Sequence, residues 1–109
     1  MQIIDRAGVY TAASGEPVHW AEHLRVPDLS VGTYSIPAGG TDTQTPHTED
    51  EIYVVTSGRA VIETPGGAAP VVPGSVIFVP AREEHRFTNV TEDLALLVIF
   101  APAEESRAS

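Results

Sequence analysis

Short runs rich in Val, Ile, Tyr and Thr alternate along this chain with turns that contain glycine or proline. The nine glycines and nine prolines fall at short intervals, which is typical of an all-β sandwich or barrel. The clearest predicted strands cover residues 30–36, 52–57, 60–63, 75–79, 85–89 and 94–100, and weaker ones cover 8–12, 18–26 and 69–72. No apolar pattern of helical period persists, apart from a weak one over residues 20–24. The pattern therefore predicts an all-β fold.

The last strong strand, LALLVIF at residues 94–100, is apolar at every position. A strand with one face in water would alternate between apolar and polar residues. We therefore expect the core to cover one face of this strand, and another layer or a second subunit to cover the other. Residues 103–109, AEESRAS, are small and polar, and this composition favours a frayed tail.

Composition narrows the range of functions. The 109 residues suit one domain, 1–109, without a linker. A net charge of −9, with arginine as the only strongly basic residue type, disfavours binding to nucleic acid and anionic membranes. The absence of cysteine excludes disulfides, thiolate ligands and a thiol nucleophile. Neither a signal peptide nor a membrane-spanning apolar run is recognisable, so we expect a soluble, cytoplasmic protein.

Two stretches carry the candidate chemistry. In the first, TPHTEDE at residues 45–51, an extended backbone would place Thr45, His47 and Glu51 on one face. In the second, HRFTN at residues 85–89, His85 lies in a strand-like setting. If both stretches face the same interior, His47, Glu51 and His85 form a set of two histidines and one carboxylate. Such a set binds Fe(II) and other divalent metals and leaves coordination positions open.

These stretches resemble the two motifs of the cupin superfamily. The first motif has glycine, five residues, His-x-His, three or four residues, Glu, six residues and glycine, and residues 39–58 keep that spacing. The second has glycine, five residues, Pro-x-Gly, two residues, His, three residues and Asn, and residues 74–89 keep it as well. Two positions differ, because Thr45 replaces the first histidine and Arg82 replaces the glycine of Pro-x-Gly. The resemblance implies a single-domain cupin β-barrel of the double-sheet jelly-roll type.

The resemblance also implies a metal site made of His47, Glu51 and His85. Gln44 could supply a further ligand in place of the imidazole that is lost at position 45. Thr45 itself, Tyr53 and Phe87 could line the pocket, the last two because they share the strand parity of the ligands.

Other residues in these regions have less specific interpretations. Glu49 and Asp50 suit solvated loop acids, although either could bind the metal instead of Glu51. His19 and His23, four residues apart, suit structural or surface positions in a strand-like context. Asn89 suits a structural role at a turn.

Two functional classes are compatible with these residues. One is a metal-dependent enzyme with Fe, Mn, Co, Ni or Zn that acts on a small molecule, with a dioxygenase as the first choice and an isomerase or lyase as further choices. The other is a non-catalytic barrel that binds a small molecule, with a structural or lost metal site. The doubly apolar strand and the exposed edges of a small barrel also predict a homodimer.

Overall fold

The computed structural model describes residues 1–108, in which six strands pair antiparallel throughout. The strands are β1 (His19–Val26), β2 (Leu29–Ile36), β3 (Asp50–Thr64), β4 (Gly67–Val71), β5 (Val76–Val79) and β6 (Arg86–Ala101). The all-β prediction is therefore confirmed. Nowhere in residues 1–108 is there a helix long and apolar enough to cross a membrane.

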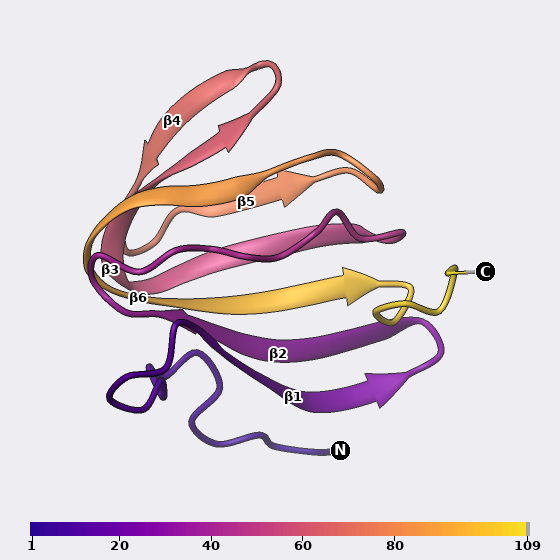
Figure 1. Cartoon of the computed structure of the whole chain (residues 1–109). Coiled ribbons are helices and arrows are strands. Elements are labelled where there is room, and N and C mark those ends of the chain that lie inside the picture. The colour runs from indigo at the N-terminus through magenta and orange to yellow at the C-terminus, as the bar shows by residue number, and fades with distance from the viewer. Residues whose placement is uncertain (109) are drawn as a thin grey trace.

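The strands form one sheet that folds over on itself. Their order is β1-β2-β6-β3-β4, and β5 pairs with the first part of β3 while β4 pairs with its last part. In Figure 1 the two long strands, β3 and β6, bend together at one side of the molecule, so that their two halves face each other. This arrangement gives the expected double-sheet barrel with its core between the two layers.

A β-bulge replaces a turn that the sequence suggested at Ser57-Gly58. We expected two strands here, but β3 continues through both, and its pairing with β6 shifts register around Gly58. Gly58 has a φ of +88°, and a Cβ atom there would lie 2.2 Å from the carbonyl oxygen of Asp93. The extra residue also switches the buried face, from Tyr53 before the bulge to Ile62 after it.

The segment around Gly8 covers part of the outer face of the sheet. The predicted strand at residues 8–12 is wrong, because these residues form no ladder and bond instead to side chains of the sheet. The amide of Gly8 donates to the Thr33 hydroxyl at 2.8 Å, and the Thr56 hydroxyl contacts both the Gly8 and Ala95 carbonyls. This layer explains why Ala95 is buried on the face of β6 opposite the core.

The residues after β6 contact β2 and the loop before β3. Ala103 is buried, and the amide of Glu104 donates to the Ser30 hydroxyl at 2.8 Å. The amides of Glu105 and Arg107 both donate to the carboxylate of Glu49. Composition does not reveal these acceptors, which lie in distant parts of the sequence. The frayed tail at residues 103–109 stays a prediction, and its Ser109 lies outside the described residues.

Candidate metal centre

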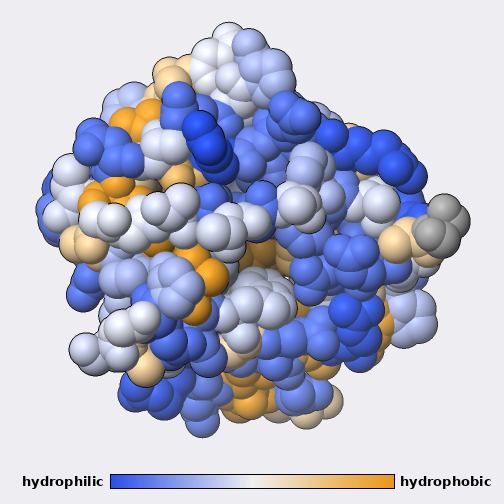
Figure 2. All heavy atoms as spheres, in the orientation of Figure 1, coloured by the Kyte–Doolittle hydropathy of each residue, from blue (hydrophilic) through white to orange (hydrophobic). Residues whose placement is uncertain are grey.

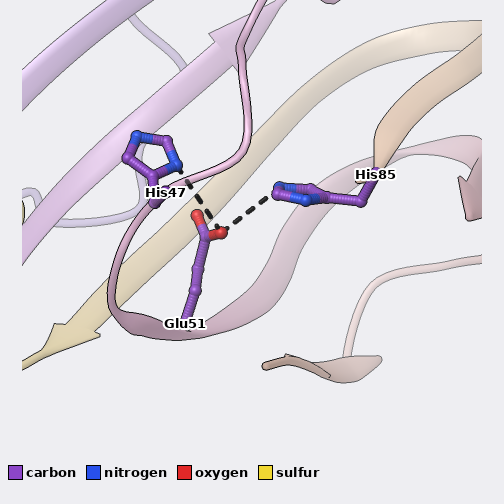
Figure 3. A group of neighbouring side chains, drawn as sticks. All are labelled: His47, Glu51 and His85. Carbon is purple, nitrogen blue, oxygen red and sulfur yellow. Dashed lines mark ion pairs between the residues drawn. The ribbon is translucent and has the colours of Figure 1, made fainter. Parts of the chain in front are cut away.

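Three segments meet at one end of the barrel and carry His47, Glu51 and His85. His47 lies in the loop before β3, Glu51 lies at the start of β3, and His85 immediately precedes β6. The two loops are tied together, because the amide of Arg82 donates to the His47 carbonyl at 2.7 Å and the amide of Ala81 donates to the Asp50 carboxylate at 2.8 Å. Figure 3 shows the two imidazole rings on either side of the Glu51 carboxylate.

The carboxylate of Glu51 is buried and lacks hydrogen-bond partners. Its Oε1 lies 3.2 Å from Nε2 of His85 and 3.9 Å from Nδ1 of His47. Both oxygens of Glu51 and Nδ1 of His47 are buried without a hydrogen bond in the described chain. Buried polar atoms of this kind call for an ion or a water. Two metal–ligand bonds of about 2.1 Å can span about 4.2 Å, so both distances fit a shared divalent ion.

The other nitrogen of each imidazole has a partner of its own. Nε2 of His47 donates to Oε2 of Glu104 at 2.9 Å, and Nδ1 of His85 donates to the carbonyl of Glu83 at 2.8 Å. In the neutral rings, these bonds leave the lone pairs on Nδ1 of His47 and Nε2 of His85, the two nitrogens that face Glu51. Metal-ligating histidines use their second nitrogen in this way, so the set fits a metal.

The charges around the two imidazoles favour a bound cation. Burial opposes protonation of His47, but its bond to Glu104 and the charge of Glu51 outweigh burial and raise its pKa. Burial likewise opposes protonation of His85, and the Glu51 carboxylate and the Glu83 carbonyl raise its pKa in the same way. The raised pKa values of both rings show that the electrostatic potential at the site is negative. A divalent ion would be stabilised by the same negative charges that favour protonation of the rings.

Beside the two histidines, a hydrogen-bonded network holds Tyr53 and Gln44. The Tyr53 hydroxyl donates to Oε1 of Gln44 at 2.8 Å and lies 2.9 Å from Nε2 of His85. The amide nitrogen of the Gln44 side chain donates to Asp42 at 2.8 Å. Burial, together with the charge of Glu51, raises the pKa of Tyr53 well above its usual value. The hydroxyl therefore stays protonated, and the Gln44 carbonyl that we considered as a metal ligand is already engaged.

A cavity of roughly 140 Å³ opens onto this cluster. Figure 2 shows a hollow near the centre of the visible face, with hydrophilic residues around it and hydrophobic atoms at its floor. Both apolar and polar side chains line the cavity. The lining residues are Trp20, Tyr34, Gln44, His47, Glu51, Tyr53, Val98, Phe100 and Glu104.

Of the three residues expected to line the pocket, only Tyr53 lines this cavity. Thr45 is exposed and lines a second groove together with Gln44 and His85. Phe87 is buried behind Tyr53, with the two rings edge to face at 5.0 Å. Thr45 therefore lies on the same groove as the candidate ligand His85, where it has a hydroxyl instead of the imidazole of the motif.

The acidic residues next to the motif have structural contacts. The expectation of a solvated Glu49 is wrong, because it is 1% exposed and accepts the amides of Glu105 and Arg107. Asp50 is exposed but caps the amide of Ala81. Neither replaces Glu51 in the cluster of candidate ligands.

The remaining histidines and the turn residues also lie away from the cavity. His19 is paired with Glu16 at 3.3 Å, and His23 bonds to the Thr33 hydroxyl at 2.6 Å. Asn89 and Arg82 are exposed and both have positive φ, 48° and 68°. Arg82 thus takes the backbone conformation that favours glycine, the residue found here in the cupin motif.

Sequence reasoning missed two acidic residues of the site. Glu104 contacts His47 across 57 positions of sequence, within a tail whose composition suggested no structure. Asp42 is 5% exposed and accepts hydrogen bonds from Tyr34, from Gln44 and from the amide of Phe87. No motif marks either residue, and only the hydrogen-bonded partners identify their roles.

Comparison with known proteins agrees with this geometry. Residues 32–100, more than half of the chain, match the family model described as a cupin domain. The chain belongs to the cupin family. An uncharacterized protein of Streptomyces coelicolor is 46% identical over 85 residues, covering 78% of this chain and 81% of that protein.

Solved cupin-like structures share the fold at low sequence identity. A cupin superfamily protein from Desulfitobacterium hafniense has a TM-score of 0.75 at 20% identity, covering 92% of this chain and 90% of that one. The DMSP lyase DddQ from Ruegeria pomeroyi has a TM-score of 0.73 at 18% identity, covering 92% of this chain and 54% of that one. At such identities the likeness establishes the fold alone.

Proposed function

We propose that this cupin binds one divalent metal ion through His47, Glu51 and His85 and acts on a small molecule in the adjoining cavity. The observation that carries the proposal is the buried Glu51 carboxylate, which has no hydrogen-bond partner and faces a ring nitrogen of each histidine. A carboxylate in this position is costly to bury unless a cation or a hydrogen bond compensates it. A metal bound there would compensate all three ligand atoms at once.

The ion, when bound, would supply Lewis-acid chemistry, or oxygen activation if it is iron. The chain's own residues would bind and orient the substrate. The Tyr53 hydroxyl, held by Gln44 and next to His85, lies at the edge of the cavity with its proton in place. Because its proton is donated to Gln44, the hydroxyl oxygen is positioned to accept a hydrogen bond from a substrate donor, and the aromatic side chains of the cavity provide apolar contact.

The cavity wall favours an uncharged substrate with an apolar body. Trp20, Phe100 and Val98 provide apolar surface, and no arginine is among the residues that line the cavity. The volume of roughly 140 Å³ suits a molecule of a few heavy atoms. A free carboxylate or phosphate group would find no neutralising side chain in this wall and would depend on the bound ion for its charge balance.

For the reaction we propose a dioxygenase first, on the two-histidine, one-carboxylate set. A lyase or an isomerase is also compatible with this fold, since the similar structure from Ruegeria pomeroyi is a DMSP lyase. The test is a screen of small neutral substrates with protein loaded separately with Fe(II), Mn(II), Co(II), Ni(II) or Zn(II). Oxygen uptake that requires both Fe(II) and substrate, and disappears in Glu51→Ala, would support the dioxygenase. Turnover without oxygen uptake would favour a lyase or isomerase.

A non-catalytic binding cupin is the second candidate. It is favoured by Thr45, which lines a groove with His85 but provides no imidazole where the motif normally has one. In this case a ligand would raise the melting temperature and be recovered unchanged. Conversion of that ligand by the wild type, but not by Glu51→Ala, would exclude this alternative.

We also propose that the protein forms a homodimer through the outer face around β5. Val76 and Phe78 of β5 are 66% and 61% exposed, and Ile52 of β3, paired with Phe78, is 37% exposed. Ile99 of β6 lies opposite Ile52 in the ladder and is half-buried. A row of apolar side chains across neighbouring strands is an expected interface when it is left open to water.

A further inference from the structure

The last described turn of the chain packs against the candidate metal site. We call residues 103–107 the C-terminal latch. Its Ala103 is buried, and the amide of Glu104 donates to the hydroxyl of Ser30 in β2. The amides of Glu105 and Arg107 donate to the two oxygens of Glu49 at 2.7 and 2.9 Å. Figure 1 shows this turn beside the end of β6, at the same end of the molecule as the loop before β3.

Glu49 is built into the fold as an acceptor for the latch. Its side chain is 1% exposed, and besides the two amides it accepts the hydroxyl of Thr48. These bonds favour the ionised form and, against the effect of burial, lower the pKa of Glu49. A buried carboxylate with three donors holds its partners firmly, and Glu49 lies two residues after His47 in the same loop. The latch is therefore fastened to the segment that carries a candidate ligand.

Through Glu104, the latch determines the state and orientation of the His47 ring. The carboxylate of Glu104 accepts the Nε2 proton of His47 at 2.9 Å, which leaves Nδ1 to face Glu51. The ring of Phe100 lies 4.6 Å from the His47 ring and limits its rotation from another side. Since the two nitrogens point in different directions, Glu104 contacts the ring on the side away from Glu51.

We infer that Glu104 is the positioning residue of His47 and that Glu49, by fastening the latch, keeps Glu104 in place. This inference rests on the proposed metal-binding function. A carboxylate that accepts the second proton of a metal-bound imidazole fixes its tautomer and raises its basicity, and its loss commonly weakens metal affinity 10- to 100-fold. Because Glu104 also lines the cavity, the latch forms part of the cavity wall beside the candidate ligands.

The test is a titration of metal-free protein with Co²⁺, followed by the fluorescence of Trp20. Trp20 is the single tryptophan and lines the cavity, so a nearby Co²⁺ ion should quench it. We expect Glu104→Ala to weaken Co²⁺ binding 10- to 100-fold. Glu104→Gln should recover most of the affinity, because its amide oxygen can accept the same hydrogen bond. Glu92→Ala removes an exposed carboxylate that pairs with Arg59 and should bind as the wild type does.

A second variant tests the fastening separately. Glu49→Gln keeps one acceptor oxygen and loses the other, so the amides of Glu105 and Arg107 should exchange with solvent faster than in the wild type. Its Co²⁺ affinity should fall in the same direction as that of Glu104→Ala, although Glu49 contacts no candidate ligand atom.

Binding by the wild type with unchanged affinity in Glu104→Ala would overturn the inference and leave the metal site intact. Faster exchange in Glu49→Gln with unchanged affinity would overturn the role of Glu49. No binding by the wild type would overturn the proposed metal site and the inference with it.

Discussion

Replacing Arg82 by glycine should stabilise the protein. Arg82 has a φ of 68°, a conformation that costs a residue with a side chain about 1–2 kcal/mol relative to glycine. Glycine also makes the unfolded chain more flexible, which offsets about 0.4–1 kcal/mol of this gain. The exposed Arg82 side chain forms no ion pair within residues 1–108, while its amide, which donates to the His47 carbonyl, is kept by glycine. We therefore expect a net gain of about 0.5–1 kcal/mol.

Thermal and urea unfolding of metal-free protein would measure this gain. For a chain of this size about 1 kcal/mol corresponds to a rise of about 4–8 °C in Tm, so Arg82→Gly should raise Tm by about 2–8 °C. Arg82→Ala is the matched control, because it removes the same side chain but keeps the unfavourable φ, and it should not raise Tm. If Arg82→Ala stabilised the protein as much as Arg82→Gly, the backbone explanation would be refuted and the arginine side chain would be responsible.

Three further substitutions test contacts within the sheet and the proposed dimer interface. A Cβ atom at Gly32 would lie 2.3 Å from the Trp20 ring. Gly32→Ala should therefore destabilise the fold by about 1–3 kcal/mol and shift the emission spectrum of Trp20. An unchanged spectrum and Tm would contradict the contact between Gly32 and Trp20. Gly58→Ala, with its Cβ 2.2 Å from the Asp93 carbonyl, should lower stability in urea by more than about 2 kcal/mol, and a loss below about 0.5 kcal/mol would argue against the bulge. Phe78→Glu should give a monomer in light scattering at micromolar concentration. The control Ile3→Glu changes another exposed apolar side chain and should leave the dimer intact. A dimer that survives Phe78→Glu would contradict the proposed interface.

The architecture was predictable because strand patterns and turn residues are local signals. The sequence predicted the strands that became β1, β2, β4 and β5 to within a few residues, but divided β3 and β6 in two. Gly58 appeared to be a turn because glycine with positive φ serves turns and bulges alike. Only the pairing partner of β3, which is distant in sequence, distinguishes the two.

The candidate ligands were predictable from motif spacing, whereas their supporting residues were not. His47, Glu51 and His85 come together as a group with ligand atoms within 4.8 Å of one another. Motif spacing does not specify which wall of the site Thr45 lines, and the structure puts it in a groove with His85 rather than in the cavity beside His47 and Glu51. Glu104 was missed because a single hydrogen bond joins it to His47 from a segment whose composition is that of a solvated tail.

The metal content of purified protein tests the central claim most directly. Wild type, His47→Ala and His23→Ala would be purified side by side without chelator, and their metals counted by mass spectrometry. His23 is the matched control, because it bonds to Thr33 away from the cavity. We predict about one divalent ion per chain in the wild type and in His23→Ala, with loss of the ion in His47→Ala. A wild type that holds no metal and gains none from Fe(II), Mn(II), Co(II), Ni(II) or Zn(II), or a His47→Ala variant that retains its ion, would contradict the proposed site.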